Sequence, residues 1–219
     1  MYNFTFNIPT KIHFGKDTIS NLSELKAYGS KVLLVYGGGS IKKNGLYDTA
    51  MKILKDAGLT VFELSGVEPN PKIETVRKGV EICKNEGIDM VLAIGGGSTI
   101  DCSKVVAAGA KYDGDAWDLV LDGSKVKAAL PIFDVLTLSA TGTEMDPFAV
   151  ISDMSKNEKW GTGSPYMVPT MSILNPEYTF SVSKKQTAAG TADMMSHTME
   201  NYFSMENADC QKFMAEGLL

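Results

Sequence analysis

Two glycine-rich turns are the strongest chemical signal in the sequence. Residues 37–40 and 95–98 both read GGGS, and each follows a continuous apolar run and precedes a helical pattern. Glycine lets backbone N–H groups approach a phosphate closely, and the N-terminus of the following helix adds partial positive charge. A single turn of this kind is equally consistent with a tight connection that binds nothing. Two of them at neighbouring strand ends favour a dinucleotide site.

The first turn, at residues 37–40, is also where the adenosine ribose of a dinucleotide would be recognised. A carboxylate there would bind a 2′-hydroxyl and repel a 2′-phosphate. Residues 37–43 contain no carboxylate, and they offer Ser40, Lys42 and Lys43. The two lysines alone are equally consistent with a solvated helix start. The missing acid therefore carries the prediction, and it favours NADP over NAD.

Asp193 and His197 are candidate metal ligands. They lie at positions i and i+4 of GTADMMSHTMENY, so that a helix would present both side chains on one face. A carboxylate and an imidazole suit Fe²⁺ or Zn²⁺, and a bound cation could polarise a carbonyl during hydride transfer. From spacing alone a surface Asp–His pair is the more common outcome, and two ligands do not make a tight site. The other histidine, His13, is given no role.

A third polar cluster is the segment 137–144 (TLSATGTE). Its hydroxyl groups follow an apolar run, and at the end of a strand they can hold phosphate and the nicotinamide ribose. A loop rich in Ser and Thr that caps its own backbone is the alternative. Taken alone, this segment favours the alternative.

Strands and helices in alternation must position these groups. Continuous apolar runs predict strands at 32–36, 60–64, 90–94, 132–137 and 171–174. Helices are predicted from 40 to about 57, from 73 to Gly87 and from 98 to about 110. Strands that are buried on both faces belong to a mostly parallel sheet covered on both sides, an α/β fold. At the N-terminus, alternation of Tyr2, Phe4, Phe6, Ile12 and Phe14 predicts an edge hairpin or a pair of strands.

After about Asn175 only helical patterns remain. We therefore predict two domains: an α/β dinucleotide-binding domain over 1–180 and, over 181–219, the first helix or helices of a truncated all-α domain. Residues 184–216 contain no proline and only one glycine, which is typical of helix.

Composition excludes several classes of protein. The 219 residues carry 21 Lys+Arg against 26 Asp+Glu, a formal net charge of −5, which argues against nucleic acid or an anionic membrane as the main partner. No apolar run approaches the roughly 18 residues that span a bilayer, and no signal-peptide core is present. The three cysteines, Cys83, Cys102 and Cys210, form neither a disulfide framework nor a zinc motif. A cytoplasmic location is expected.

Together these stretches resemble the iron-containing alcohol dehydrogenase family, in particular its NADP-dependent butanol dehydrogenase and aldehyde reductase branch. The resemblance runs through the whole chain: FGKDTI, YGGGSIKKNG, EPNP, GGGSTIDCSK, TLSATGTEMD, AVISD, NPEYT and ADMMSHTMENY. It implies a Rossmann-like domain followed by a helical domain, as in the dehydroquinate-synthase-like fold, with the active site between them. It also implies that Asp193 and His197 are the first two metal ligands and act in catalysis through the metal. The cofactor contacts that it implies are Gly38, Gly39, Ser40, Gly96, Gly97, Ser98, Asp101, Thr137, Ser139, Thr141, Lys159 and Tyr178.

We therefore expect a metal-dependent oxidoreductase that transfers a hydride between NADP(H) and a short primary alcohol or aldehyde, as a homodimer. Family members supply two further histidine ligands from later helices, and no histidine follows His197 here. This departure means that the 219-residue chain could be inactive alone. The alternatives are a glycerol-dehydrogenase-like or dehydroquinate-synthase-like enzyme of the same fold, or an inactive cofactor-binding fragment.

Overall fold

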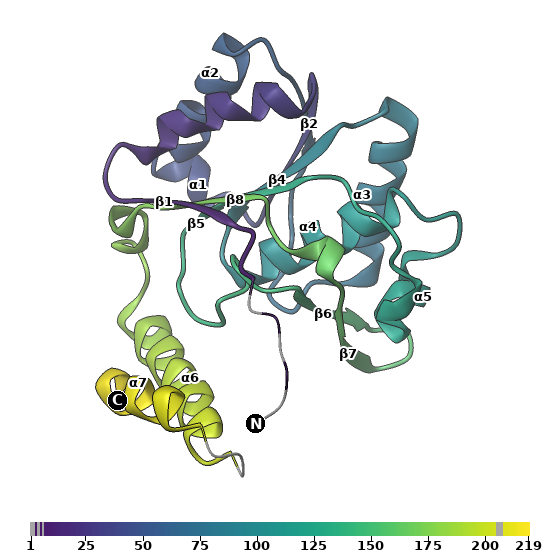
Figure 1. Cartoon of the computed structure of the whole chain (residues 1–219). Helices are drawn as coiled ribbons and strands as arrows, with labels where there is room; N and C mark the ends of the chain where they lie inside the picture. Colours follow the sequence, from purple (N-terminus) through teal and green to yellow (C-terminus); the bar gives the residue numbers. More distant parts are fainter. Residues whose placement is uncertain (1–2, 4, 6, 205–207) are drawn as a thin grey trace.

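A parallel sheet dominates the first 180 residues of the computed structural model, which describes residues 3, 5, 7–204 and 208–219 (Figure 1). The sheet has six strands in the order β1-β8-β5-β4-β2-β3, and neighbouring strands are parallel throughout. The strands are β1 (Lys11–Phe14), β2 (Lys31–Tyr36), β3 (Thr60–Leu64), β4 (Met90–Gly95), β5 (Ile132–Leu136) and β8 (Met171–Leu174). The predicted α/β fold is thus confirmed.

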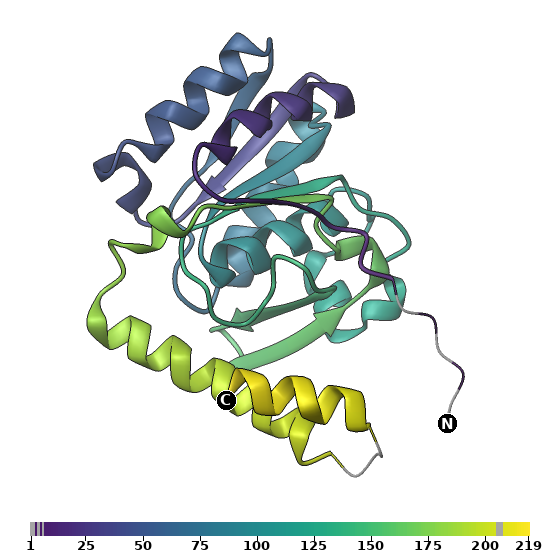
Figure 2. The ribbon, with the colours of Figure 1, turned by 60° about the vertical axis from the view of Figure 1, so that its left-hand side comes forward.

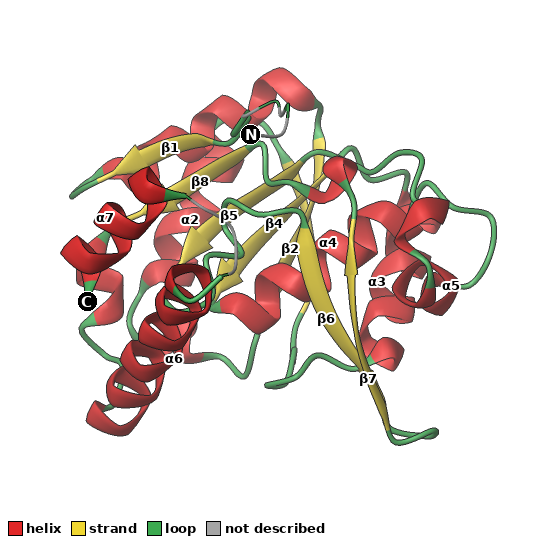
Figure 3. Cartoon of the chain, turned by 60° about the horizontal axis from the view of Figure 1, so that its bottom comes forward, coloured by secondary structure: helices red, strands yellow, loops and turns green. Residues whose placement is uncertain are grey.

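Helices cover both faces of this sheet, as Figure 3 shows. Side chains alternate between the faces along each strand. In β2, Leu33 packs in the core beneath α3, α4 and α5, whereas Leu34 packs in the core beneath η1 and α2. The helices of this domain are η1 (Thr18–Tyr28, a 3₁₀-helix), α1 (Ser40–Lys43), α2 (Leu46–Asp56), α3 (Ile73–Glu86), α4 (Gly97–Gly109) and α5 (Ala116–Leu121), with short 3₁₀ turns η2 (Gly123–Lys125), η3 (Pro165–Met167) and η4 (Pro176–Thr179).

Two predictions about the first 60 residues need correction. β1 is an edge strand that pairs in parallel with β8, and the described residues of the N-terminal segment form no hairpin with it. The aromatic residues Tyr2, Phe4 and Phe6, which prompted the hairpin, lie outside the described residues. The helix predicted from 40 to 57 is two helices, α1 and α2, because Gly45 between them adopts a φ of 78° that ends the first.

A two-stranded antiparallel hairpin, β6 (Phe148–Asp153) and β7 (Glu158–Gly163), was not predicted. It lies beside α4 rather than in the main sheet (Figure 1). A hydrophobicity pattern does not detect β7, because only one of its six residues is buried and two are glycines. The hairpin matters for function because it carries Lys159.

The chain ends in two helices, α6 (Lys184–Tyr202) and α7 (Asp209–Leu218), which pack on each other outside the sheet (Figures 1 and 2). The Ser183 side chain caps α6 by accepting a hydrogen bond from the Gln186 N–H. The helical character predicted for this segment is confirmed for the described residues, whereas the division into two domains at 180/181 stays a prediction. Within the described ranges, no helix is long and apolar enough to cross a membrane.

Candidate functional site

The carboxyl ends of β2, β4, β5 and β8 bring the predicted site segments together. These strands are neighbours in the sheet, so that the loops following them lie along one edge. At the end of β4, Gly95 packs so closely on Thr99 that a Cβ atom would lie 2.4 Å from its Oγ1. α4 then begins at Gly97, and its first N–H groups have no partner within the helix. Such an arrangement can bind an anion, as a phosphate cradle must.

A hollow of about 330 Å³ opens at the N-terminus of α4, and we call it the α4 hollow. It brings together five of the predicted cofactor residues from three distant segments. Its lining comprises Asn70, Pro71, Gly97, Ser98, Asp101, Leu138, Ala140, Thr141, Val150 and Lys159. Lys159 donates a hydrogen bond of 2.7 Å from Nζ to Asn70 Oδ1, which holds the ammonium at the wall of the hollow. Asn70, part of the EPNP stretch, is a lining residue to which the sequence analysis gives no role.

Asp101 differs from the other predicted contacts in its bonding. Its Oδ1 accepts from the Thr143 hydroxyl at 2.6 Å, and its Oδ2 accepts from the Val150 N–H at 3.0 Å. Burial raises the pKa of Asp101, and these two hydrogen bonds oppose the rise. Both oxygens therefore tie α4 to the 143–150 segment, so that Asp101 shapes the wall of the hollow, and its contact with cofactor stays a prediction.

A second hollow, of about 310 Å³, lies at the end of β2, and we call it the β2 hollow. Gly37, Gly38 and Gly39 form its floor, and Tyr36, Lys42, Ser65 and Gly66 complete its lining. Gly39 adopts a φ of 97°, which requires glycine, and Ser40 starts α1 just beyond it. A Cβ atom on Gly38 would meet nothing within 4 Å, so that this position has room for a side chain.

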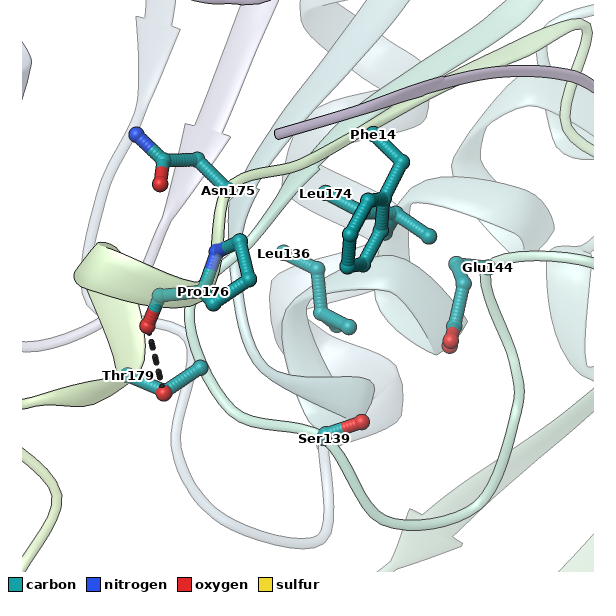
Figure 4. A pocket seen from close by; sticks show the side chains of 8 residues that line it. All are labelled: Phe14, Leu136, Ser139, Glu144, Leu174, Asn175, Pro176 and Thr179. Carbon is teal, nitrogen blue, oxygen red and sulfur yellow. Dashed lines mark hydrogen bonds between the residues drawn. The ribbon is translucent and has the colours of Figure 1, made fainter. Parts of the chain in front are cut away.

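An apolar hollow of about 220 Å³ lies beside the Ser/Thr-rich loop, at the ends of β1, β5 and β8 (Figure 4). Phe14, Leu136 and Leu174 supply its apolar surface, and Ser139 and Glu144 stand at its polar side. An apolar surface with a few polar groups suits a planar ring. Of the remaining predicted contacts, Thr137 donates its N–H to the Gly95 carbonyl at 2.9 Å, Gly96 lies against Leu138, and Tyr178 lines a separate hollow beside Gly45.

α6 brings Asp193 and His197 together, as the spacing predicts. His197 Nε2 lies 3.8 Å from Asp193 Oδ1, and both side chains are about half exposed. Gly190 precedes them on the same face at helical spacing, and a Cβ atom on it would lie 3.3 Å from the Ser139 carbonyl oxygen. This face of α6 therefore meets the polar loop after β5. The donor set fits two ligand positions of an Fe²⁺ or Zn²⁺ site, and the residues that the structure describes contain no group of three His, Cys, Asp or Glu that could hold a metal.

Comparison with known proteins identifies the family. Residues 9–176 match the sequence profile described as iron-containing alcohol dehydrogenase. The chain belongs to the iron-containing alcohol dehydrogenase family. The predicted resemblance is thereby confirmed, and so is the fold class, because solved structures of this family superpose on nearly the whole chain.

Relatives within the family differ in the cofactor that their names carry. The NADH-dependent butanol dehydrogenase A of Clostridium acetobutylicum is 60% identical over 100% of this chain and 57% of its own length. The NADPH-dependent aldehyde reductase of Escherichia coli is 40% identical, also over 100% of this chain and 57% of its own. A crystal structure of the NADH-dependent butanol dehydrogenase A of Thermotoga maritima has a TM-score of 0.95 at 47% identity, covering 99% of this chain and 55% of that one. The chain thus spans little more than half the length of the relatives it matches.

Proposed function

We propose that the protein acts in a metal-dependent alcohol dehydrogenase that transfers a hydride between a nicotinamide dinucleotide and a short primary alcohol or aldehyde. The observation that carries this proposal is the convergence of Gly97, Ser98, Thr141 and Lys159 on the α4 hollow. The helix N-terminus and the Lys159 ammonium suit the pyrophosphate, and the hydroxyl of Thr141 suits a ribose. Family membership supports the reaction class, and the names of relatives support butanol and related aldehydes as substrates.

The metal belongs to the proposal through Asp193 and His197, which would hold Fe²⁺ or Zn²⁺ with further ligands from outside the described residues. Such an ion, when bound, would polarise the oxygen of the substrate. The residues of this chain bind and orient the dinucleotide beside it, since the face of α6 that carries both ligands meets the loop containing Ser139 and Thr141. A cytoplasmic location remains part of the proposal.

For the cofactor, we propose that the site accepts NADP(H), which residues 37–43 predict, as well as NAD(H), which the names of two relatives carry. Fluorescence titration of the 219-residue protein with NADPH and with NADH tests the function directly. Saturable binding of at least one of them is expected. Failure of both to bind would overturn the proposal.

Gly38→Asp should change the choice between the two nucleotides. The new carboxylate has room at this position and would accept a hydrogen bond from a 2′-hydroxyl but repel a 2′-phosphate. We expect the ratio of the NADPH Kd to the NADH Kd to rise about tenfold, equivalent to ~1.4 kcal/mol. Gly38→Asn is the matched control because it adds the same volume without charge. An equal ratio in the Asp and Asn variants would contradict the assignment of the 2′ position to the β2 hollow.

We also propose a homodimer in which the open edge of β1 pairs with another copy. The Lys11 N–H donates to the carbonyl of Thr170, just before β8, and the Gly15 N–H donates to the carbonyl of Leu174 at the end of β8, both at 3.0 Å. Since successive N–H groups of a strand point to opposite sides, those of Ile12 and Phe14 point to the open edge.

Ile12→Pro tests this interface, because proline removes an outward N–H and leaves the bonds to β8 in place. Light scattering coupled to size-exclusion chromatography should report a dimer for the parent protein and for Ile12→Val, and a monomer for Ile12→Pro. A parent protein that is monomeric, or a proline variant that remains fully dimeric, would contradict the proposed interface.

A further inference from the structure

A carboxylate contacts two of the residues that line the β2 hollow, although residues 37–43 contain none. Glu63 is the penultimate residue of β3, and β3 pairs with β2 so that Glu63 lies opposite Leu34. The Tyr36 hydroxyl donates to Glu63 Oε2 at 2.6 Å, and the Tyr47 hydroxyl donates to Oε1 at 2.8 Å. Both oxygens are thus occupied and the carboxylate is fixed in place.

Lys42, which lines the β2 hollow, is held in the same cluster. Its Nζ lies 3.8 Å from Glu63 Oε2, 4.9 Å from the centre of the Tyr36 ring and 4.4 Å from the centre of the Tyr47 ring. Aromatic faces attract a cation, and the carboxylate neutralises it. Lys42 is therefore not a free surface lysine, because two rings and an anion hold its ammonium at the wall of the hollow.

We infer that Glu63 is a specificity-determining residue that limits the affinity of the β2 hollow for a 2′-phosphate. The inference rests on the proposed function and refines it. A 2′-phosphate in this hollow would be attracted by Lys42 and repelled by Glu63 beside Lys42, so that the two charges largely cancel. A 2′-hydroxyl carries no charge, so that the charges of Lys42 and Glu63 have little effect on its binding. Lys42 and Glu63 together therefore set the ratio of NADP(H) to NAD(H) binding.

The charge state of Glu63 fits this role. Burial acts to raise the pKa of Glu63, but the hydrogen bonds from Tyr36 and Tyr47 and the charge of Lys42 outweigh burial and lower it. The carboxylate is thus ionised at neutral pH. The hydrogen bond to Glu63 in turn raises the pKa of Tyr47, so that this hydroxyl remains a donor.

If Glu63 had a purely structural role, its replacement would change NADH and NADPH binding in a different way. The same contacts join α2 to the end of β3, and their loss could loosen the whole turn. Loosening would weaken NADH and NADPH binding alike, whereas an electrostatic role changes NADPH binding selectively and fades at high salt.

The deciding experiment measures both dissociation constants by fluorescence titration for the parent protein, Glu63→Gln and the control Glu81→Gln, which removes the same charge from an exposed position of α3. Glu63→Gln should bind NADPH about tenfold more tightly, with the NADH Kd changed less than twofold, and molar salt should abolish the gain. Glu81→Gln should bind both nucleotides as the parent does.

Lys42→Gln provides an independent arm in case Glu63→Gln does not fold, because Lys42 is half exposed. It should weaken NADPH binding about fivefold and leave NADH binding unchanged. If neither nucleotide binds the parent, the proposed function fails. If both bind and neither variant changes their ratio, or each variant shifts both constants equally, the inference about Glu63 is overturned and the proposed function stands.

Discussion

Replacing Lys104 by methionine is expected to lower the free energy of unfolding by about 3 kcal/mol. Lys104 lies in the middle of α4 and its side chain is completely buried. Its Nζ lies 2.8 Å from each of four acceptors, namely the Thr143 hydroxyl oxygen, Asp146 Oδ1 and the carbonyl oxygens of Asp146 and Phe148, which share its three N–H hydrogens. Methionine fills a similar volume but removes the ammonium, so that Asp146 loses its cationic partner and keeps only the hydrogen bond from the Phe148 N–H to Oδ1. Asp146 is 32% exposed and can recover some hydration, which keeps the loss at the lower end for a broken buried ion pair.

Urea unfolding followed by circular dichroism measures this loss, provided that the slope against urea is the same in both proteins. Lys111→Met is the matched control, because it makes the same change at an exposed position just after α4. The control should lie within about 0.5 kcal/mol of the parent, as surface substitutions usually do. A Lys104→Met variant as stable as the control would show that the buried ammonium contributes nothing net to the fold.

Two polar side chains of α4 hold the Ser/Thr-rich loop in place at Thr143. Lys104 and Asp101 bind Thr143 from two sides, so that the hydroxyl accepts from the ammonium and donates to the carboxylate. Because α4 also presents its N-terminus to the α4 hollow, the helix fixes the phosphate cradle and the adjacent loop together. These contacts therefore fix the positions of the cofactor segments relative to one another.

The central part of the fold is predictable from the sequence because its strands are buried on both faces. Continuous apolar runs at 32–36 and 90–94 cannot be surface segments, and the glycines after them mark tight turns into helices. These two features fix the sheet and the positions of both GGGS turns. The Asp193–His197 pair follows from helical spacing alone.

Features that depend on tertiary contacts could not be predicted from the sequence. Inspecting residues 37–43 for an acid misses Glu63, because only the order of strands in the sheet brings β3 beside β2. A lysine is ordinarily assigned to the surface, even in an apolar helix. The hydrogen-bond partners that allow Lys104 to be buried lie about 40 residues further along the chain, where the helical pattern gives no sign of them. The β6–β7 hairpin has too few buried residues in β7 to give an alternating pattern.

The contacts of Asp134 favour a neutral carboxyl group. Ser172 Oγ lies 2.6 Å from Asp134 Oδ2 and 2.8 Å from the Glu144 carbonyl oxygen. Ser172 has one hydroxyl hydrogen and a carbonyl can only accept, so that when the hydroxyl donates to Glu144 the hydrogen of the 2.6 Å contact must come from Asp134. Asp134 is completely buried in β5 and its Oδ1 has no partner, an arrangement that would be costly for an ion.

The neutral carboxyl group makes stability depend on pH in a definite direction. Burial raises the pKa of Asp134 well above its ordinary value, with a smaller contribution from the charge of Glu144, and it outweighs the hydrogen bond with Ser172 and the charge of Lys104, which both lower the pKa. The unfolded chain loses this proton near pH 4, whereas the folded protein keeps it. The unfolded state then binds fewer protons, and stability falls by about 1.4 kcal/mol per pH unit until the folded carboxyl group itself titrates.

Asp134→Asn should therefore gain stability relative to the parent as the pH rises above about 4. The amide can donate to Ser172 in place of the acid, and it does not titrate. Unfolding free energies of the two proteins, measured side by side across the range, cancel the contributions of the other carboxylates in their difference. Asp113→Asn makes the same change at an exposed position and should run parallel to the parent. A constant difference between Asp134→Asn and the parent would mean that Asp134 is ionised in the folded state, so that Ser172 donates to it rather than to Glu144.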